Sequence, residues 1–304
     1  MSELVKNRSE ILFLYDVKDA NPNGDPVDEN KPRIDEETGM NIVTDVRLKR
    51  TIRDYLFEYK KKDVFVREIR DDKGNLKTKE DRLKDFDNDP QKVIQNCLDI
   101  RLFGATTAVE DKTMALTGPV QFKYGRSLHK VDLTYVKGTT VMPSGAERKQ
   151  GTFTERYILP YSLIAFYGVV NENAAQQQGI QLLEEDISLM LEGIWNGTKN
   201  LISGSKFGQM PRLLIQVIYK TGNFYIGELD RRIALQTDKN HEAIRDISEV
   251  TINISNLVKT LKDYKDKIEK IRVKTDEKIV YFKDGQKVLL SDALKPISVE
   301  DIIF

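Results

Sequence analysis

The chain has 304 residues, enough for one elaborated domain or two ordinary ones, and its 39% hydrophobic content is sufficient for a buried core. The 48 basic and 48 acidic residues cancel, which argues against a nucleic-acid binder that acts through an overall positive field. The single cysteine, Cys97, cannot form an intramolecular disulfide, and no apolar run is long enough to span a bilayer. We therefore expect a soluble, cytoplasmic protein whose charges are arranged locally.

The first sixty residues predict a strand, a loop and a helix. Residues 11–15 form a short apolar run typical of a buried strand, and the acidic, turn-rich loop that follows continues to Thr44. Thr44 is a suitable N-cap for a helix over residues 45–60, whose apolar stripe contains Leu48 and Ile52. The opposite face of this helix carries four basic residues, which are Arg47, Lys49, Arg50 and Arg53.

Further along the chain, strands are expected over residues 116–124, 156–170 and 212–219, with helices over residues 91–103 and 180–195. The core order is then β-α-β-β-α-β, so the fold class is α+β with a ferredoxin-like or RNA-recognition-motif palm. We assign residues 1–60, 98–124 and 156–235 to this palm. The remaining segments are a charged insertion at 61–97, a projecting glycine-punctuated hairpin at 125–155, and a C-terminal extension at 236–304.

The C-terminal extension contains two patterns. An amphipathic helix is expected after Ser255, because apolar residues recur at helical spacing from Leu257 to Ile271. Asp284-Gly285 between two apolar runs predicts a β-hairpin.

Basic residues with interleaved aromatic residues suggest RNA contact at three places. Guanidinium groups form bidentate hydrogen bonds with phosphate, and aromatic rings stack on bases. The places are the basic helix face with Phe57, the projecting hairpin, and the glycine-bearing loop at residues 204–212. The alternative for the helix is a solvated face on which acids pair with the bases.

Candidates for catalysis are poor. His129 and His241 are the only histidines, and neither has a metal-ligand spacing with Cys97. A Mg²⁺ ion could use Asp16, Asp19 and Asp25, but turn capping explains these aspartates better. We expect no metal, no cofactor and no enzymatic activity.

Several strings, in the same order, resemble a known family. They are NRSEILFLYD (7–16) running into ANPNGDP (20–26), TDVRLKRTIRDY (44–55), DIRLFG (99–104), TGPVQ (117–121) and YSLIAFY (161–167). Together they resemble the CRISPR-associated backbone subunit of Cascade, family seven, in its type I-B form. The resemblance is most specific over the first 60 residues and recurs to about residue 220.

This resemblance implies a palm, a fingers insertion and a thumb hairpin. It also implies that copies of the chain stack head to tail along guide crRNA and, with other Cascade subunits, present the guide for pairing with target DNA. The RNA contacts carried over from the resemblance and the basic clusters are Asn21, Asn23, Arg47, Lys49, Arg50, Arg53, Lys123, Arg126, Arg148, Lys149, Arg156, Lys206 and Arg212.

Two other functions stay open at this point. One is an endoribonuclease of the same superfamily, for which Asp132 in the proposed thumb is the candidate residue. The other is an α/β module that binds acidic proteins through its basic helix face. The chain lacks the aromatic signature of ordinary RNA-recognition motifs, so stacking of bases on the sheet face is not expected.

Overall fold

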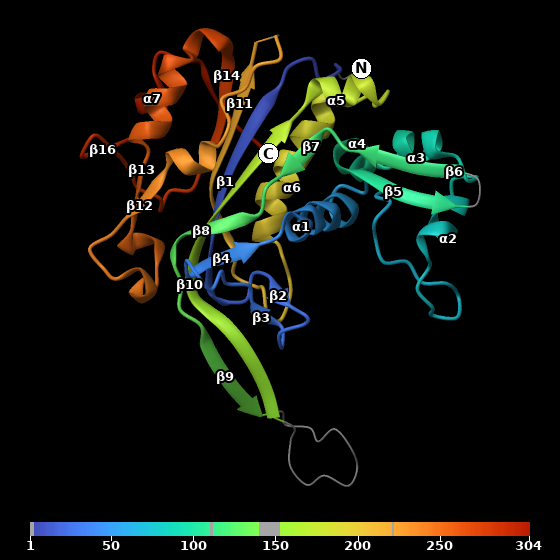
Figure 1. Ribbon diagram of the computed structural model, residues 1–304, viewed down its shortest axis with the longest axis horizontal. Coiled ribbons are helices and arrows are strands. Elements are labelled where there is room, and N and C mark those ends of the chain that lie inside the picture. The colour runs from blue at the N-terminus through green and yellow to red at the C-terminus, as the bar shows by residue number, and fades with distance from the viewer. Residues whose placement is uncertain (1–2, 110–111, 140–152, 221) are drawn as a thin grey trace.

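A large sheet organises the molecule, for which the computed structural model describes residues 3–109, 112–139, 153–220 and 222–304. Within these residues the strands lie side by side in the order β17-β14-β11-β1-β10-β8-β4, while β7 and β9 pair with other parts of β10 (Figure 1). Their bounds are β1 Ser9–Ala20, β4 Met40–Val43, β7 Val120–Phe122, β8 Gly125–Lys130, β9 Thr134–Thr139, β10 Phe153–Val170, β11 Met210–Tyr219, β14 Ile268–Thr275 and β17 Val299–Asp301.

The central strand β1 is longer than the five residues expected from the sequence. It pairs antiparallel with β10 on one side and β11 on the other, and its first nine residues are buried. Alternate side chains point to opposite faces of a strand. Phe13 accordingly belongs to one hydrophobic core, and Leu12 and Leu14 belong to a second. The sheet is therefore buried on both faces.

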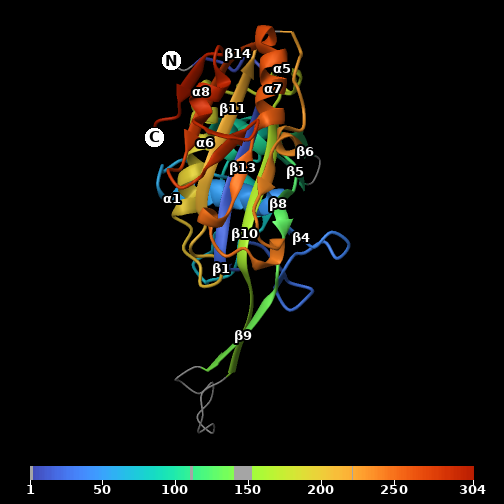
Figure 2. The ribbon, with the colours of Figure 1, turned by 90° about the vertical axis from the view of Figure 1, so that its left-hand side faces the viewer.

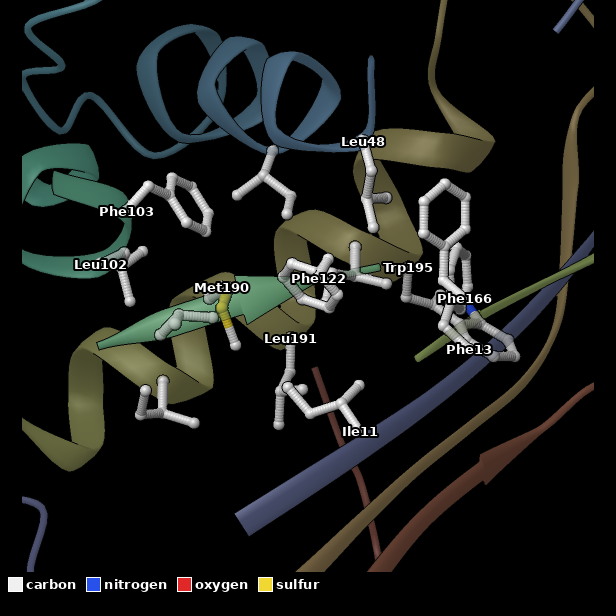
Figure 3. Packing of buried hydrophobic residues seen from close by; sticks show 14 of the residues in the cluster. Ile11, Phe13, Leu48, Leu102, Phe103, Phe122, Phe166, Met190, Leu191 and Trp195 are labelled. Atoms are coloured by element: carbon white, nitrogen blue, oxygen red, sulfur yellow. The ribbon is translucent and has the colours of Figure 1, made fainter. Parts of the chain in front are cut away.

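Two helices cover the first face, where Phe13 lies beside Phe166 and where Met190 belongs to the same hydrophobic core (Figure 3). They are α1 (Asp45–Glu58) and α6 (Glu184–Lys199), and the short α5 (Glu172–Gln177) precedes α6. The predicted cap of α1 is confirmed, because the Thr44 side chain accepts a hydrogen bond from the Arg47 amide. The helices approach closely at Gly197, where a Cβ atom would lie 3.0 Å from Cβ of Tyr55.

The C-terminal segment covers the second face (Figure 2). Its helices are α7 (Ser255–Asp263) and α8 (Leu290–Leu294), beside a small sheet of β12 (Ala234–Gln236), β13 (Thr251–Asn253), β15 (Tyr281–Lys283) and β16 (Gln286–Val288). The hairpin predicted at Asp284-Gly285 is confirmed. The expectation that one helix runs to Ile271 is wrong, because the chain changes to β14 at Ile268 and pairs with β11.

A buried carboxylate attaches this C-terminal layer to the sheet. Glu10 of β1 is fully buried and accepts hydrogen bonds from the hydroxyls of Tyr167 and Tyr219. It also accepts the backbone amides of Ile226 and Gly227, at 3.0 and 2.7 Å. These four donors compensate the carboxylate, so the layer is joined by polar as well as apolar contacts.

The charged segment after α1 forms a lobe with a separate small core (Figure 1). It contains α2 (Lys79–Lys84), α3 (Pro90–Asn96), α4 (Leu98–Phe103) and the hairpin of β5 (Gly104–Val109) and β6 (Lys112–Thr117). The single helix expected over residues 91–103 is interrupted at Cys97, which has extended backbone angles. The strand expected over residues 116–124 is divided between β6 and β7.

An arm projects from the lower end of the sheet in the view of Figure 1. It consists of β9 paired with the first residues of β10, from Phe153 to Ile158. The segment expected to begin this hairpin, β8, pairs with β4 and β10 in the large sheet. A second small hairpin, β2 (Gly24–Asp25) with β3 (Lys31–Pro32), lies near the root of the arm. The division into palm, fingers and thumb stays a prediction.

Candidate nucleic-acid interface

The four basic residues of α1 do not share one exposed face. Lys49 and Arg53 are each only 9% exposed, which corrects the placement expected from the helical wheel. Arg53 Nε donates to Asp99 at 2.8 Å, and Lys49 Nζ donates to Asp45 at 2.9 Å. Both cations lie over the ring of Phe103 in α4. The helix is thus covered on a second side by the lobe, and these two charges are neutralised internally.

Arg50 agrees with the alternative interpretation of the helix, a solvated face on which acids pair with the bases. Its guanidinium forms an ion pair with Asp54, four residues along the helix, at 2.7 Å, and both side chains are partly exposed. Such pairs on a helix surface stabilise by only about 0.3–0.5 kcal/mol. Arg50 can therefore exchange this partner for a ligand at small cost.

Arg47, in the first turn of α1, lacks such compensation. Its Nη2 donates to the Thr51 hydroxyl at 2.9 Å, while its buried Nε has no hydrogen-bond partner among the described residues. Burial lowers the pKa of Arg47, which means that its charge is held at a cost in free energy. Asp54 opposes this shift but is engaged by Arg50.

Lys206 adds a second uncompensated charge beside Arg47. Burial lowers the pKa of Lys206, and repulsion from Arg47 lowers it further. Within the described residues its Nζ donates one hydrogen bond, to the hydroxyl of Ser205 at 3.2 Å. In the described part of the chain, neither Arg47 nor Lys206 forms an ion pair. Two like charges, partly removed from water, form a site that a phosphate would stabilise.

A polar cleft of about 540 Å³ opens next to the loop that carries Lys206, at the root of the β9–β10 arm. Its walls come from the end of β1, the β2–β3 hairpin, the first part of β10 and the loop before β11. Two of the predicted RNA contacts, Asn21 and Arg156, line the cleft. A third, Lys206, stands in the chain between Ser205 and Phe207, which both line it. Arg156 Nη1 donates to the carbonyl of Gly204 at 3.0 Å.

The two predicted asparagines hold the loops of this site. Asn23 accepts the amide and the hydroxyl of Thr44, at 2.8 and 2.9 Å, and so fixes the start of α1. The backbone amide of Asn21 donates to the backbone carbonyl of Ser205 at 2.7 Å, and this hydrogen bond fixes the Lys206 loop. Asn21 is 2% exposed, and its side-chain oxygen has no hydrogen-bond partner among the described residues.

The other predicted contacts are arranged differently. Arg212 lies in β11, near the start of the strand expected over residues 212–219, and is 6% exposed. It forms ion pairs with Asp16 and Asp276, so it is not the free cation of the glycine-bearing loop that was expected. Lys123 pairs with Asp230 at 3.3 Å and Arg126 pairs with Asp35 at 2.8 Å, and both remain partly exposed. Arg148 and Lys149 lie outside the described residues.

The structure adds two side chains that the sequence reasoning did not select. Phe207, beside Lys206, lines the cleft and is 72% exposed. Tyr157 donates its hydroxyl to Glu29 at 2.9 Å and thereby joins the root of the arm to the β2–β3 hairpin. An aromatic residue directly after Lys206 was the available signal for Phe207, but no local pattern links Tyr157 to a residue 128 positions away.

The candidates for catalysis do not converge. Among the described residues, no group of three or more histidine, cysteine, aspartate or glutamate side chains could hold a metal ion. Asp16 is bound to Arg212 and Tyr161, and Asp25 is bound to Arg33. Asp132 is half-exposed, with Arg245 at 3.8 Å.

Fold and site together define a mixed α+β protein in which a loop that carries one of two uncompensated cations lines a polar cleft. The model of the family described as CRISPR-associated protein Cas7 matches residues 7–255. A protein of Haloferax volcanii with that same description is 33% identical to this chain. The aligned region spans 90% of this chain and 88% of that protein. The chain belongs to the Cas7 family of CRISPR-associated proteins.

Solved structures agree with this assignment at the level of the fold. A chain of a structure titled "CRISPR RNA-guided surveillance complex" has a TM-score of 0.55 at 16% identity, with 89% of each chain covered. A chain of a structure titled "CRISPR RNA-guided surveillance complex, pre-nicking" has a TM-score of 0.59 at 13% identity, with 97% of this chain and 96% of the other covered. Within the described residues, no helix has the length and apolar character to cross a membrane.

Proposed function

We propose that this chain is a non-catalytic backbone subunit of a type I CRISPR effector complex in the cytoplasm. Copies of it assemble head to tail along guide crRNA, grip the phosphate backbone, and present the bases for pairing with target DNA. Other subunits of the complex complete the assembly. Membership of the Cas7 family and likeness in fold to chains from RNA-guided surveillance complexes support the proposal.

The observation that carries the proposal is the pair of cations Arg47 and Lys206. A cation that serves only to hold the fold is normally neutralised by a carboxylate, as Arg53 is by Asp99. Arg47 and Lys206 instead repel one another beside a cleft. A phosphate diester supplies the missing negative charge without any sequence preference, which suits a protein that must hold guides of any sequence.

The strand order supports a palm of the RNA-recognition type. The antiparallel strands β11-β1-β10-β7 correspond to the fourth, first, third and second strands of the β-α-β-β-α-β order. The C-terminal layer covers the face that is open in an isolated motif, so Tyr161, Tyr167 and Tyr219 on that face are buried. The guide would therefore bind at the loop end near the arm instead of on the sheet.

Binding of guide RNA tests the proposal directly. The double variant Arg47→Glu, Lys206→Glu should bind single-stranded RNA at least tenfold more weakly, and the slope of log affinity against log salt should fall by about two. Lys259→Glu is the matched control, because Lys259 is an exposed helical lysine on α7 that pairs with Asp263. Equal losses in the double variant and the control would contradict the assignment of the phosphate site.

Assembly and RNA integrity separate the scaffold from an endoribonuclease. Mass measured by light scattering should rise with guide length, and the guide should stay intact with and without Mg²⁺. Specific cleavage that disappears in Asp132→Ala would overturn the non-catalytic proposal.

A further inference from the structure

The cleft beside the cation pair has the wrong charge to hold a phosphate itself. Three carboxylates, from Asp19, Glu29 and Glu155, line it, against the single guanidinium of Arg156. That guanidinium already donates to a backbone carbonyl. A wall rich in acceptors repels anions and attracts groups that donate hydrogen bonds, such as hydroxyls.

Within this wall, Asn21 carries an acceptor that is left without a donor. Its Nδ2 donates to the carbonyl of Asn30 at 2.7 Å, and this contact fixes the orientation of the carboxamide, because the opposite orientation would bring two oxygens together. The oxygen Oδ1 is buried and has no partner among the described residues. A buried carbonyl without a donor costs free energy, which a donor from a ligand would recover.

Asn21 is also tied to the phosphate site through the backbone. Its backbone amide donates a hydrogen bond to the carbonyl of Ser205, the residue before Lys206. Ser205 and Phe207, the neighbours of Lys206 in the chain, both line the cleft. The ribose 2′-hydroxyl is the donor that every ribonucleotide carries whatever its base, and deoxyribonucleotides lack it.

We propose that Asn21 Oδ1 accepts the 2′-hydroxyl of one bound ribonucleotide, so that the cleft distinguishes RNA from DNA. This inference rests on the proposed function, since it concerns the sugar of the same bound strand. The contact adds a selection for ribose to a phosphate site that by itself would accept either nucleic acid.

The test uses the complete chain and single-stranded RNA of about 12 nucleotides, within the site sizes typical of single-strand binders. Replacing every 2′-hydroxyl by fluorine removes the donor while a short, electronegative substituent remains. We expect the wild-type chain to bind the fluorinated strand about fivefold to tenfold more weakly, the value of one hydrogen bond. In Asn21→Ala the two strands should bind equally.

Asn41→Ala is the matched control. Asn41 is also a buried asparagine whose Nδ2 donates to a backbone carbonyl of the same hairpin region, that of Arg33 at 2.8 Å. Its Oδ1, however, already accepts the hydroxyl of Ser162. This variant should retain the preference for the 2′-hydroxyl even if its stability falls.

The possible outcomes distinguish failure of the inference from failure of the proposed function. Equally tight binding of the unmodified and the fluorinated RNA by the wild-type chain would overturn the ribose contact and leave the proposed scaffold function intact. So would a preference for unmodified RNA that persists in Asn21→Ala. A preference that follows base identity would assign the donor to a base amine and would also overturn it. Absence of RNA binding by the wild-type chain would overturn the scaffold itself.

If Asn21→Ala does not fold, the wild-type chain still decides the matter. Fluorine placed at one nucleotide at a time should weaken binding at one position of the bound strand. A uniform effect along the strand would contradict a single ribose contact.

Discussion

Two sets of basic side chains in this molecule differ in what neutralises them. Arg53 and Arg212 are buried against the carboxylates of Asp99 and Asp16. Arg47 and Lys206 are half-buried without an ion pair among the described residues. The first set holds elements together, and the second set is available to an anionic ligand. Basic residue type alone therefore does not separate the cations that hold the fold from those that an anionic ligand could neutralise, whereas the presence or absence of an internal acid does.

The largest expected effect tests the first set. Asp99 is fully buried and accepts Arg53 Nε together with the amides of Phe65 and Val66, at 2.7 and 3.1 Å. Asp99→Ala leaves these donors without an acceptor and should lower the free energy of unfolding by about 3–5 kcal/mol. Urea denaturation measures this loss. Asp263→Ala, which removes an exposed carboxylate from α7, should change it by no more than about 0.5 kcal/mol.

The second set predicts the opposite balance between stability and binding. Because burial and Arg47 lower the pKa of Lys206, its protonated form is less favourable in the folded chain than in the unfolded chain. Lys206→Met should therefore leave the melting temperature unchanged or raise it, while RNA affinity falls about tenfold. A matched fall in melting temperature and affinity would place Lys206 among the residues that hold the fold.

Sequence patterns predicted well those features that depend on neighbours in the chain. The Thr44 cap, the start of α1 and the Asp284-Gly285 hairpin follow from local turn and capping chemistry, and the structure has all three. The strong apolar run in β1 and the hydrophobic spacing in α6 also gave the correct element types.

Features that depend on distant partners could not be predicted in this way. A helical wheel assumes one buried side, whereas α1 also contacts α4, and this second contact buries Lys49 and Arg53. Isoleucine spacing at Ile268 and Ile271 fits a helix, but the free edge of β11 takes this segment as a strand. Likewise, the cleft joins Asn21 to Arg156 and Ser205 across more than 130 residues of chain, a proximity that no local pattern encodes.

A buried histidine gives a smaller effect, which depends on pH. His129 Nε2 accepts the Leu163 amide at 3.2 Å, and its Nδ1 lies 2.7 Å from the carbonyl of Lys130 and 3.2 Å from that of His241. The ring also stacks on Tyr161, and Glu242 lies close enough to favour its protonation. Burial, the largest influence, lowers the pKa of His129 below its usual 6.5. The folded chain therefore favours the neutral ring.

Because the unfolded chain binds this proton more readily, the stability contributed by His129 is fully present above pH about 6.5 and is lost as the pH falls below that value. The slope of the free energy of unfolding against pH that is due to His129 should reach at most about 1.4 kcal/mol per pH unit. Melting curves between about pH 7.5 and about pH 5, which bracket this value, measure it. His129→Asn should reduce the slope. His241→Asn should reduce it less, because the His241 ring packs edge-on against His129 and its charge contributes to the lowered pKa of that ring.

Arg50 provides the smallest effect and the finest test of the comparison, because it is intermediate between the two sets. It has an acid, Asp54, but both side chains are partly exposed, at 40% and 30%. Arg50→Ala should lower the free energy of unfolding by no more than about 0.5 kcal/mol and should weaken RNA binding less than Arg47→Ala does. Affinities of the two variants, measured at the same salt concentration, make the comparison.

If Arg50→Ala weakens RNA binding as much as Arg47→Ala does, the ligand contacts paired and unpaired cations alike, and the missing acid no longer marks the site. If the order is as expected, Asp54→Ala should bring Arg50 closer to Arg47 in its contribution to binding.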